Sequence, residues 1–130
     1  MKYIKPIIAM IILVAIDQLT KYIITANYAI GGGFSVIKDV FEIRYLRNEG
    51  AAWGMLQGKR VIFLIITAIV LIFGAYVYYK LINTDKHYNA IKVLLVFFLS
   101  GAIGNMIDRL LNGYVVDFLY IKLINFPIFN

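Results

Sequence analysis

The residues best suited to chemistry form one polar run near the C-terminal end of the chain, residues 101–117. Its first part ends a long apolar stretch, and at helical spacing Asn105 and Asp108 share a face, with Arg109 four residues after Asn105. Ionisable groups at membrane depth are costly and usually functional. The run therefore predicts a functional role for Asn105, Asp108 and Arg109, against the alternative of an Asp–Arg pair that only stabilises a helix end.

Two glycines, Gly101 and Gly104, stand in the same run on the same predicted helix face. Small residues at this spacing let two membrane helices approach closely, and asparagine hydrogen-bonds across such contacts. The glycines are therefore predicted to pack a neighbouring helix rather than to take part in chemistry.

Asp117 closes the run within an apolar, β-prone segment. Desolvation there would raise the pKa of its carboxyl, and a second carboxylate nearby would raise one of the pair further. Two such groups sharing a proton can activate water and protonate a leaving amine. Asp108 and Asp17 are candidate partners, but Arg109 and Lys21 stand close to them in sequence. An exposed strand aspartate remains the alternative.

The amino-acid composition indicates which environment surrounds this protein. The chain has 130 residues, of which 62% are hydrophobic and 15% charged, and the mean hydropathy is +0.83. A soluble domain is nearer 45–50% apolar and about a quarter charged, so we predict a membrane protein. The net charge of +6 does not indicate nucleic-acid binding, because the basic residues flank apolar runs instead of forming one solvated face.

Metal chemistry has little support in the sequence. There is no cysteine, and the single histidine, His87, lies in a polar loop segment. A lone loop histidine is more often a solvated residue than a ligand. We therefore expect no metal site.

Three apolar segments are long enough to cross a bilayer, which takes about 20 residues. The sequence predicts spans at about residues 4–25, 61–79 and 90–107. Near the end of the first span Asp17 and Lys21 are four residues apart, so on a helix they share a face and can neutralise each other. The fold class is therefore mainly α and polytopic, with one membrane domain over residues 1–130.

The segments at about residues 26–60 and 108–130 are predicted to lie together on one side of the membrane. Residues 41–45 alternate apolar and charged side chains, and residues 114–120 follow an Asn-Gly turn with a β-prone run. Because both segments lie on the same side, they are expected to pair into a small sheet at the membrane surface.

Orientation follows from the distribution of lysine and arginine. With the N-terminus in the cytoplasm, the short cytoplasmic pieces carry a net charge of +4, from five lysines and one aspartate. The longer outer segments carry eight basic and six acidic residues, a net +2. The positive-inside rule therefore favours a cytoplasmic N-terminus.

Taken together, the polar segments resemble those of bacterial lipoprotein signal peptidase, also called signal peptidase II. Five motifs occur in family order and spacing and are distributed over essentially the whole chain: Asp17–Lys21, Asn48–Trp53, Gly101–Arg109, Gly113–Phe118 and Phe126–Asn130. Each motif alone is a modest signal, but five in order make chance agreement improbable.

The resemblance implies a four-span aspartyl endopeptidase of the bacterial cytoplasmic membrane, with a small extracytoplasmic sheet and its active site at the extracytoplasmic face. It implies removal of signal peptides from diacylglyceryl-modified prolipoproteins, by a monomer in contact with membrane lipid and without metal or organic cofactor. Asp117 matches one half of the catalytic pair. Further positions match residues that line the site, position substrate or stabilise the pair: Asp17, Asn48, Asn105, Arg109 and Asn130.

The second catalytic aspartate of this family belongs to a Phe-Asn-x-Ala-Asp motif. Phe129 and Asn130 match its start, and the aspartate would fall three residues further on. We therefore expect a C-terminally truncated chain without the fourth span, inactive by itself because one carboxylate cannot act as both base and acid. A non-catalytic polytopic membrane protein and a substrate-binding pseudo-enzyme remain the alternatives.

Overall fold

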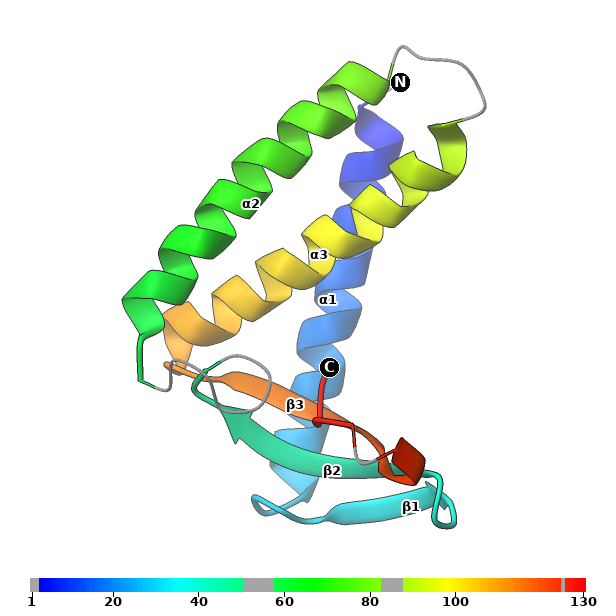
Figure 1. The fold of residues 1–130 in the computed structure, drawn as a ribbon, viewed down its shortest axis with the longest axis vertical. Helices are drawn as coiled ribbons and strands as arrows, with labels where there is room; N and C mark the ends of the chain where they lie inside the picture. Colours follow the sequence, from blue (N-terminus) through cyan, green and yellow to red (C-terminus); the bar gives the residue numbers. More distant parts are fainter. Residues whose placement is uncertain (1–2, 51–57, 83–87, 125) are drawn as a thin grey trace.

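The computed structural model describes residues 3–50, 58–82, 88–124 and 126–130. These residues form three long helices with a small antiparallel sheet across one end (Figure 1). The helices are α1 (Ile4–Asn27), α2 (Arg60–Leu81) and α3 (Asn89–Leu111). All three are long and apolar enough to cross a membrane. The predicted mainly α, polytopic fold is confirmed.

The helices bury little of their apolar surface inside the protein. In the most apolar window of each helix, the buried share is 11% for α1, 6% for α2 and 22% for α3. Isoleucine, leucine and phenylalanine side chains instead point outward along all three helices. Because such a continuous apolar surface is unstable in water, its solvent must be lipid.

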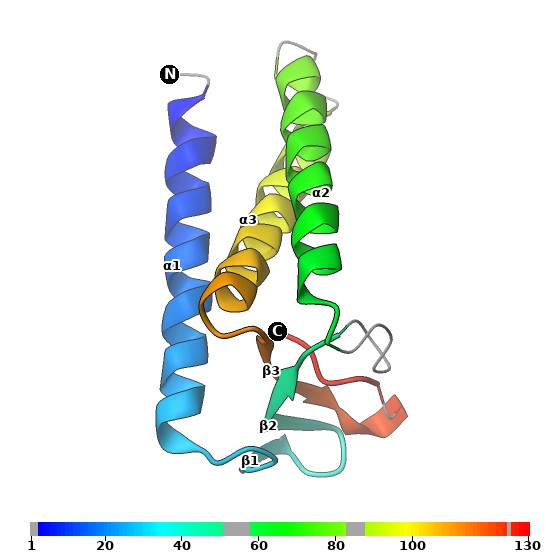
Figure 2. The same cartoon turned by 90° about the vertical axis from the view of Figure 1, so that its left-hand side faces the viewer.

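Helix α3 is the central element, since it packs against both α1 and α2. Figure 2 shows α1 and α3 close together near the sheet and further apart at the opposite end. The N-terminus lies at that opposite end, whereas the C-terminus lies beside the sheet (Figure 1). The closest approach of α1 to α3 is therefore next to the sheet.

The sheet contains β1 (Gly33–Ile37), β2 (Phe41–Asn48) and β3 (Val115–Ile121), in the order β1-β2-β3 with antiparallel pairing. The predicted pairing of the two β-prone segments is confirmed as β2 with β3. Strand β1 was not predicted, because all five of its residues are exposed and no burial alternation marks it. Gly33 begins β1 with φ of 156°, and a Cβ there would collide with the Ile43 carbonyl.

A small core of Ile24, Tyr45 and Val116 joins α1 to the sheet.

Strand β3 and the end of the chain lie against each other. After a short 3₁₀ turn, Lys122–Ile124, the chain returns along β3, where Phe129 pairs with Leu119. This return brings Asn130 to the middle of β3.

Helix α3 continues to Leu111 and therefore includes Asp108 and Arg109, as their helical spacing predicted. One expectation from the sequence needs correction. Of the two predicted packing glycines, only Gly104 contacts another helix, since a Cβ on it would collide with the Asp17 carboxylate, whereas a Cβ on Gly101 would meet nothing within 4 Å.

Some expectations fall on residues outside the described ranges. Residues 51–57 include Trp53 of the second motif, and residues 83–87 include His87 and two charges of the orientation count, Asp85 and Lys86. Lys2 also lies outside.

The different surroundings of the two glycines give a matched pair of substitutions. Gly104→Ala should lower the free energy of unfolding by about 1–3 kcal/mol, because a methyl group there displaces Asp17 and separates α1 from α3. Gly101→Ala should leave it unchanged or slightly raised, since alanine is the better helix former. Unfolding in mixed micelles, followed by far-UV circular dichroism, measures both. Equal losses for the two variants would contradict the assignment of the contact to Gly104.

Candidate active site

Asp117 lies on β3 with 4% of its surface exposed. Both oxygens of its carboxylate accept a side-chain amide hydrogen bond: Oδ2 from Asn48 Nδ2 at 2.7 Å and Oδ1 from Asn130 Nδ2 at 2.8 Å. The Asn48 amide is oriented by its own Oδ1, which accepts the Gly50 N–H at 3.0 Å. Asp117 is therefore buried and held in one orientation from two sides.

Asn130 connects Asp117 to the helices. Its Nδ2 also lies 3.1 Å from the Val116 carbonyl and 3.1 Å from Asn105 Oδ1. The same Asn105 oxygen accepts a hydrogen bond from Lys21 Nζ at 3.1 Å. A continuous path of hydrogen bonds thus runs from α1 through α3 and the C-terminal segment to β3.

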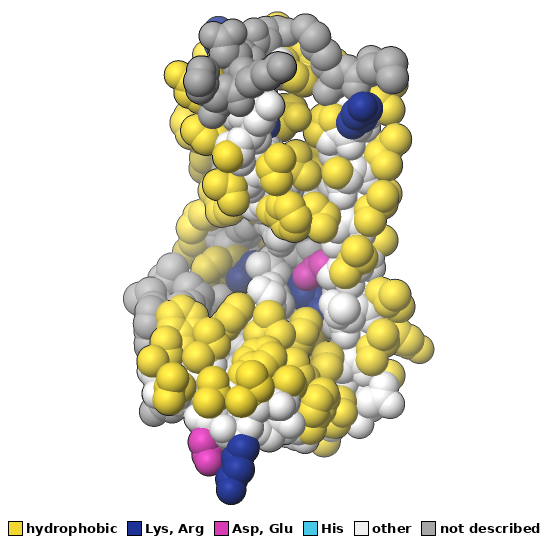
Figure 3. Space-filling model, turned by 90° about the vertical axis from the view of Figure 1, so that its right-hand side faces the viewer, with side chains coloured by type: hydrophobic (Ala, Val, Ile, Leu, Met, Phe, Trp, Pro, Cys, Tyr) yellow, Lys and Arg dark blue, Asp and Glu magenta, His cyan; other side chains and the backbone are white. Residues whose placement is uncertain are grey.

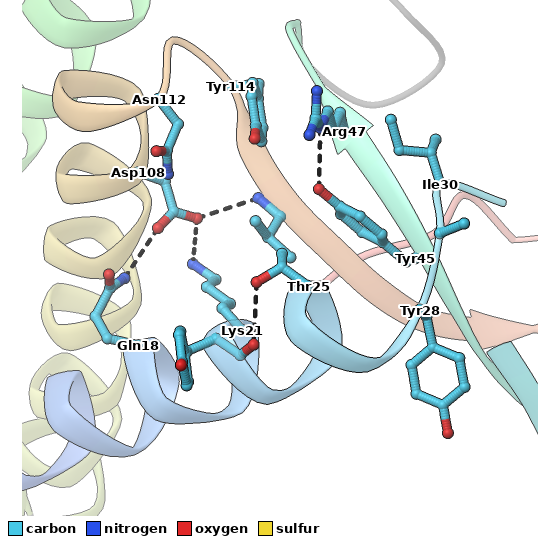
Figure 4. A pocket seen from close by; sticks show the side chains of 13 residues that line it. Gln18, Lys21, Thr25, Tyr28, Ile30, Tyr45, Arg47, Asp108, Asn112 and Tyr114 are labelled. Carbon is cyan, nitrogen blue, oxygen red and sulfur yellow. Dashed lines mark hydrogen bonds and ion pairs between the residues drawn. The ribbon is translucent and has the colours of Figure 1, made fainter. Parts of the chain in front are cut away.

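Lys21 also belongs to an ionic cluster with Asp17 and Asp108. Lys21 Nζ is 2.9 Å from Asp17 Oδ2 and 2.9 Å from Asp108 Oδ2, and Lys21 and Asp108 are 3% and 2% exposed. Asp108 also accepts hydrogen bonds from Gln18 Nε2 at 3.0 Å and from the Val116 N–H at 3.1 Å (Figure 4). One cation and several N–H donors therefore compensate two carboxylates, of which Asp108 is buried and Asp17 is 20% exposed.

Arg109 has a different partner from the one its sequence position indicated. Asp108 pairs with Lys21 of α1, whereas Arg109 Nη2 donates to the Gly50 carbonyl at 3.2 Å and its guanidinium lies 4.7 Å from the centre of the Phe63 ring. Arg109 thus connects the end of α3 to the segment after β2 and to α2. It is 9% exposed.

The groups around Asp117 shift the pKa of its carboxyl in opposite directions. Burial raises the pKa of its carboxyl from 3.8 to about 6, and this outweighs the lowering by the Asn48 hydrogen bond and by the positive charges of Lys21 and Arg109. A carboxyl with a pKa of about 6 is better suited than an ordinary one both to take up and to return a proton.

The residues predicted from sequence differ in how directly they contact this carboxylate. Asn48 and Asn130 contact Asp117 directly, and Asn105 contacts Asn130. Arg109 and Asp17 lie one step further out, the first beside Gly50 and the second on Lys21. The bridging role of Lys21 and the part played by Gln18 were not predicted, although both belong to the motif at the end of the first span.

Figure 3 shows one face of the molecule, on which acidic and basic side chains lie in a hollow between the sheet and the apolar helices. Asp117 itself is 4% exposed. Within the described ranges, no group of three or more His, Cys, Asp or Glu residues is placed to hold a metal ion.

Fold and site together define a polytopic membrane protein with a buried, titratable carboxylate at the sheet end of its helices. The family model described as signal peptidase (SPase) II matches residues 9–130. A lipoprotein signal peptidase of Brevibacillus brevis is 45% identical over 119 residues, which are 92% of this chain and 78% of the relative. The lipoprotein signal peptidase of Staphylococcus aureus strain JH9 is 44% identical over 127 residues, 95% of this chain and 76% of the relative.

Solved structures agree with these relatives. A bacterial membrane enzyme determined at 2.3 Å resolution superposes with a TM-score of 0.85 and 41% identity, over 98% of this chain and 77% of the other. A second, at 1.9 Å, gives 0.80 and 42%, over 98% and 82%. The chain belongs to the signal peptidase II family, which confirms the resemblance in its motifs.

The ionic cluster makes a strong prediction about stability. Lys21→Met should lower the free energy of unfolding by about 3–5 kcal/mol, because it leaves Asp17 and Asp108 without their buried cation. Lys122→Met is the matched control, since Lys122 pairs with Asp39 and Glu42 at the exposed surface and its loss should not be measurable. Unfolding in mixed micelles compares the two. A similar small effect for both would contradict the importance of the buried cluster.

The raised pKa of Asp117 predicts a pH dependence of stability. The folded state keeps the Asp117 proton to higher pH than the unfolded state, so the unfolded state binds fewer protons and stability falls as pH rises. With pKa values of 3.8 and about 6, the fall attributable to Asp117 lies between about pH 4 and pH 6 and amounts to about 3 kcal/mol.

The measurement is the free energy of unfolding across this pH range. Asp117→Asn should remove this part of the slope. Asp39→Asn should keep it, because Asp39 is an exposed turn residue with φ of 58°, a conformation that asparagine tolerates. An unchanged slope in Asp117→Asn would show that other groups cause it.

Proposed function

We propose that this protein is an aspartyl endopeptidase that removes signal peptides from diacylglyceryl-modified prolipoproteins. The relatives named as lipoprotein signal peptidases support the substrate class. The observation that supports the chemistry is the Asp117 carboxyl, which is buried, held by two amides and titrates near neutrality. In this proposal Asp117 takes the proton from the water that attacks the scissile carbonyl.

An aspartyl mechanism needs a second carboxyl to protonate the carbonyl oxygen and then the leaving amine. Asp108 and Asp17 are poor candidates, because both are ion-paired with Lys21 and Asp108 is also held by the Val116 N–H. We therefore assign this role to the aspartate of the Phe-Asn-x-Ala-Asp pattern that Phe129 and Asn130 begin. The contact of Asn130 with Asp117 supports this choice, because the residues that follow it in the pattern start beside the carboxylate.

The remaining site residues take supporting roles in this proposal. Asn48 and Asn130 orient Asp117, and Asn105 positions Asn130. Arg109 holds the segment after β2 beside the site. We further propose that these residues and Asp17 contribute to binding the substrate.

The proposed location is the bacterial cytoplasmic membrane, with the N-terminus in the cytoplasm and the site at the extracytoplasmic face. The charge distribution supports this orientation. The position of Asp117 at the sheet end of the helices is consistent with a substrate whose lipid anchor holds its scissile bond at the membrane surface.

The test uses a chimera of residues 1–130 followed by the remaining C-terminal segment of the Brevibacillus brevis relative, reconstituted in vesicles with a diacylglyceryl-modified prolipoprotein. We expect the chimera to release the signal peptide. Asp117→Asn in the chimera should lower the rate by about 10²–10⁴, the usual contribution of a catalytic acid or base. Gel mobility or mass spectrometry of the product measures the rate.

Asp39→Asn serves as the control, since this carboxylate lies in the turn between β1 and β2, is exposed and pairs with Lys122. It should process substrate at the parent rate. Full activity of the Asp117→Asn chimera would overturn the assignment of Asp117. A chimera that binds the prolipoprotein but never cleaves it would instead favour the substrate-binding pseudo-enzyme.

A further inference from the structure

A hollow of about 480 Å³ lies between α1 and α3 near the end of the helices opposite the sheet. At this end the two helices are further apart than beside the sheet (Figure 2). The walls are mainly apolar and include Leu13 of α1 and Val93 and Phe97 of α3, together with Tyr78 of α2. The hollow is thus bounded by all three helices and is remote from the candidate active site, which lies at the sheet end.

Two lysines line the same hollow, and none of the described acidic residues does. Lys5 belongs to the first turn of α1, and Lys92 to the first turn of α3. In the described part of the chain, no ion pair includes Lys5. One hollow therefore combines apolar walls with positive charge at the end where α1 and α3 begin.

The helix ends around the hollow agree with this sign of charge. Both α1 and α3 begin here, and neither has a side-chain cap or an acidic residue in its first turn. Free N–H groups at a helix N-terminus carry a partial positive charge. Helix α2 ends on the same side with the opposite partial charge, and Lys80 in its last turn offsets it.

We propose that this hollow binds one acidic membrane phospholipid, with an acyl chain against the apolar walls and the headgroup phosphate bound by Lys5 and Lys92. Complementary charge and apolar walls in a single hollow support this occupant. The proposal concerns a bound lipid and does not depend on the proposed peptidase function.

The apolar walls face the bilayer. Ile12, Val93 and Phe97 are 51%, 54% and 58% exposed, on helices that are long and apolar enough to cross a membrane. A hollow with such walls is unfavourable for water, and in a membrane the material available to fill it is an acyl chain. From Lys5 to Leu13 a helix rises about 12 Å, a little less than half of the roughly 30 Å hydrocarbon core. An acyl chain in the hollow therefore brings its headgroup to the level of the lysines.

The lysines select among headgroups. Each can lay its methylene stem along the apolar wall and keep its ammonium at the membrane surface, where it binds a phosphate as a compact point charge. The phosphate of phosphatidylglycerol is not neutralised within its own headgroup, whereas phosphatidylcholine carries a cation of its own. We therefore expect the hollow to prefer phosphatidylglycerol over phosphatidylcholine.

The experiment measures phospholipid binding to the purified 130-residue chain. Native mass spectrometry of the protein in detergent, titrated with phosphatidylglycerol or with phosphatidylcholine of the same acyl chains, gives the bound fraction. We expect one phosphatidylglycerol per chain and about tenfold weaker binding of phosphatidylcholine. The double variant Lys5→Gln/Lys92→Gln should weaken phosphatidylglycerol binding by about tenfold, because it removes both charged partners of the phosphate. Ala9→Phe, which fills the hollow, should weaken binding of both lipids.

Each substitution has a matched control. Lys80→Gln removes a lysine at the same end of the molecule, which lies 5.5 Å from the centre of the Tyr76 ring and does not line the hollow. Ala15→Phe places the same bulk elsewhere on α1, where Ala15 lines a different hollow. Both controls should bind phosphatidylglycerol like the parent, and circular dichroism checks the folding of all variants.

Four results would overturn the proposal. Equal weakening by Lys80→Gln and the double lysine variant would indicate a general charge effect at this end. Equal affinity for the two lipids would remove the role of the lysines. Unchanged binding in Ala9→Phe would place the lipid elsewhere. Binding to the 130-residue chain that is lost in the chimera would show that the added segment, not a lipid, occupies the hollow. Because the readout is lipid retention, these results are independent of whether the chimera cleaves a prolipoprotein.

Discussion

The interaction on which the rest of the structure depends is the buried ion pair of Lys21 with Asp17 and Asp108. It joins α1 to α3 at the point where the absence of a side chain on Gly104 lets the two helices approach. Asp108 extends it to the sheet by accepting the Val116 N–H. Separating these groups would leave charges of both signs in an apolar environment, so the two helices and β3 are positioned together.

The orientation of Asp117 follows from this cluster. Lys21 donates to Asn105 Oδ1, and the same oxygen accepts from Asn130, whose amide in turn donates to Asp117. Because the Asn130 Nδ2 is surrounded by acceptors, its amide has one favourable orientation and directs N–H groups at the carboxylate. Burial raises the pKa of Asp117, whereas the Asn48 hydrogen bond and the charges of Lys21 and Arg109 lower it, and burial prevails. Lys21 is therefore connected to Asp117 through Asn105 and Asn130, without direct contact.

Hydropathy and motifs predicted the three helices and the family, because local sequence patterns mark both. The pairing of β2 with β3 was predicted because the spans place both β-prone segments on the same side. The partners of Asp108 and Arg109 could not be predicted in this way. Adjacent opposite charges indicated a pair, yet successive residues on a helix point about 100° apart, so Asp108 faces α1 and Arg109 faces α2. The contact of Lys21 with Asp108 depends on how two helices cross, and that is a property of their whole packed surfaces.

The position of the candidate site is itself a consequence of the membrane. A strand exposes backbone N–H and C=O groups that hydrocarbon cannot satisfy, so β3 and its neighbours must lie beyond the bilayer core. Helices, in contrast, satisfy their own backbone and can bring Lys21 and Asp108 up to the same boundary. A carboxylate on a strand next to the helix ends is thus partly desolvated, with the aqueous side close by. The proposed hydrolysis of a lipid-anchored chain needs both conditions.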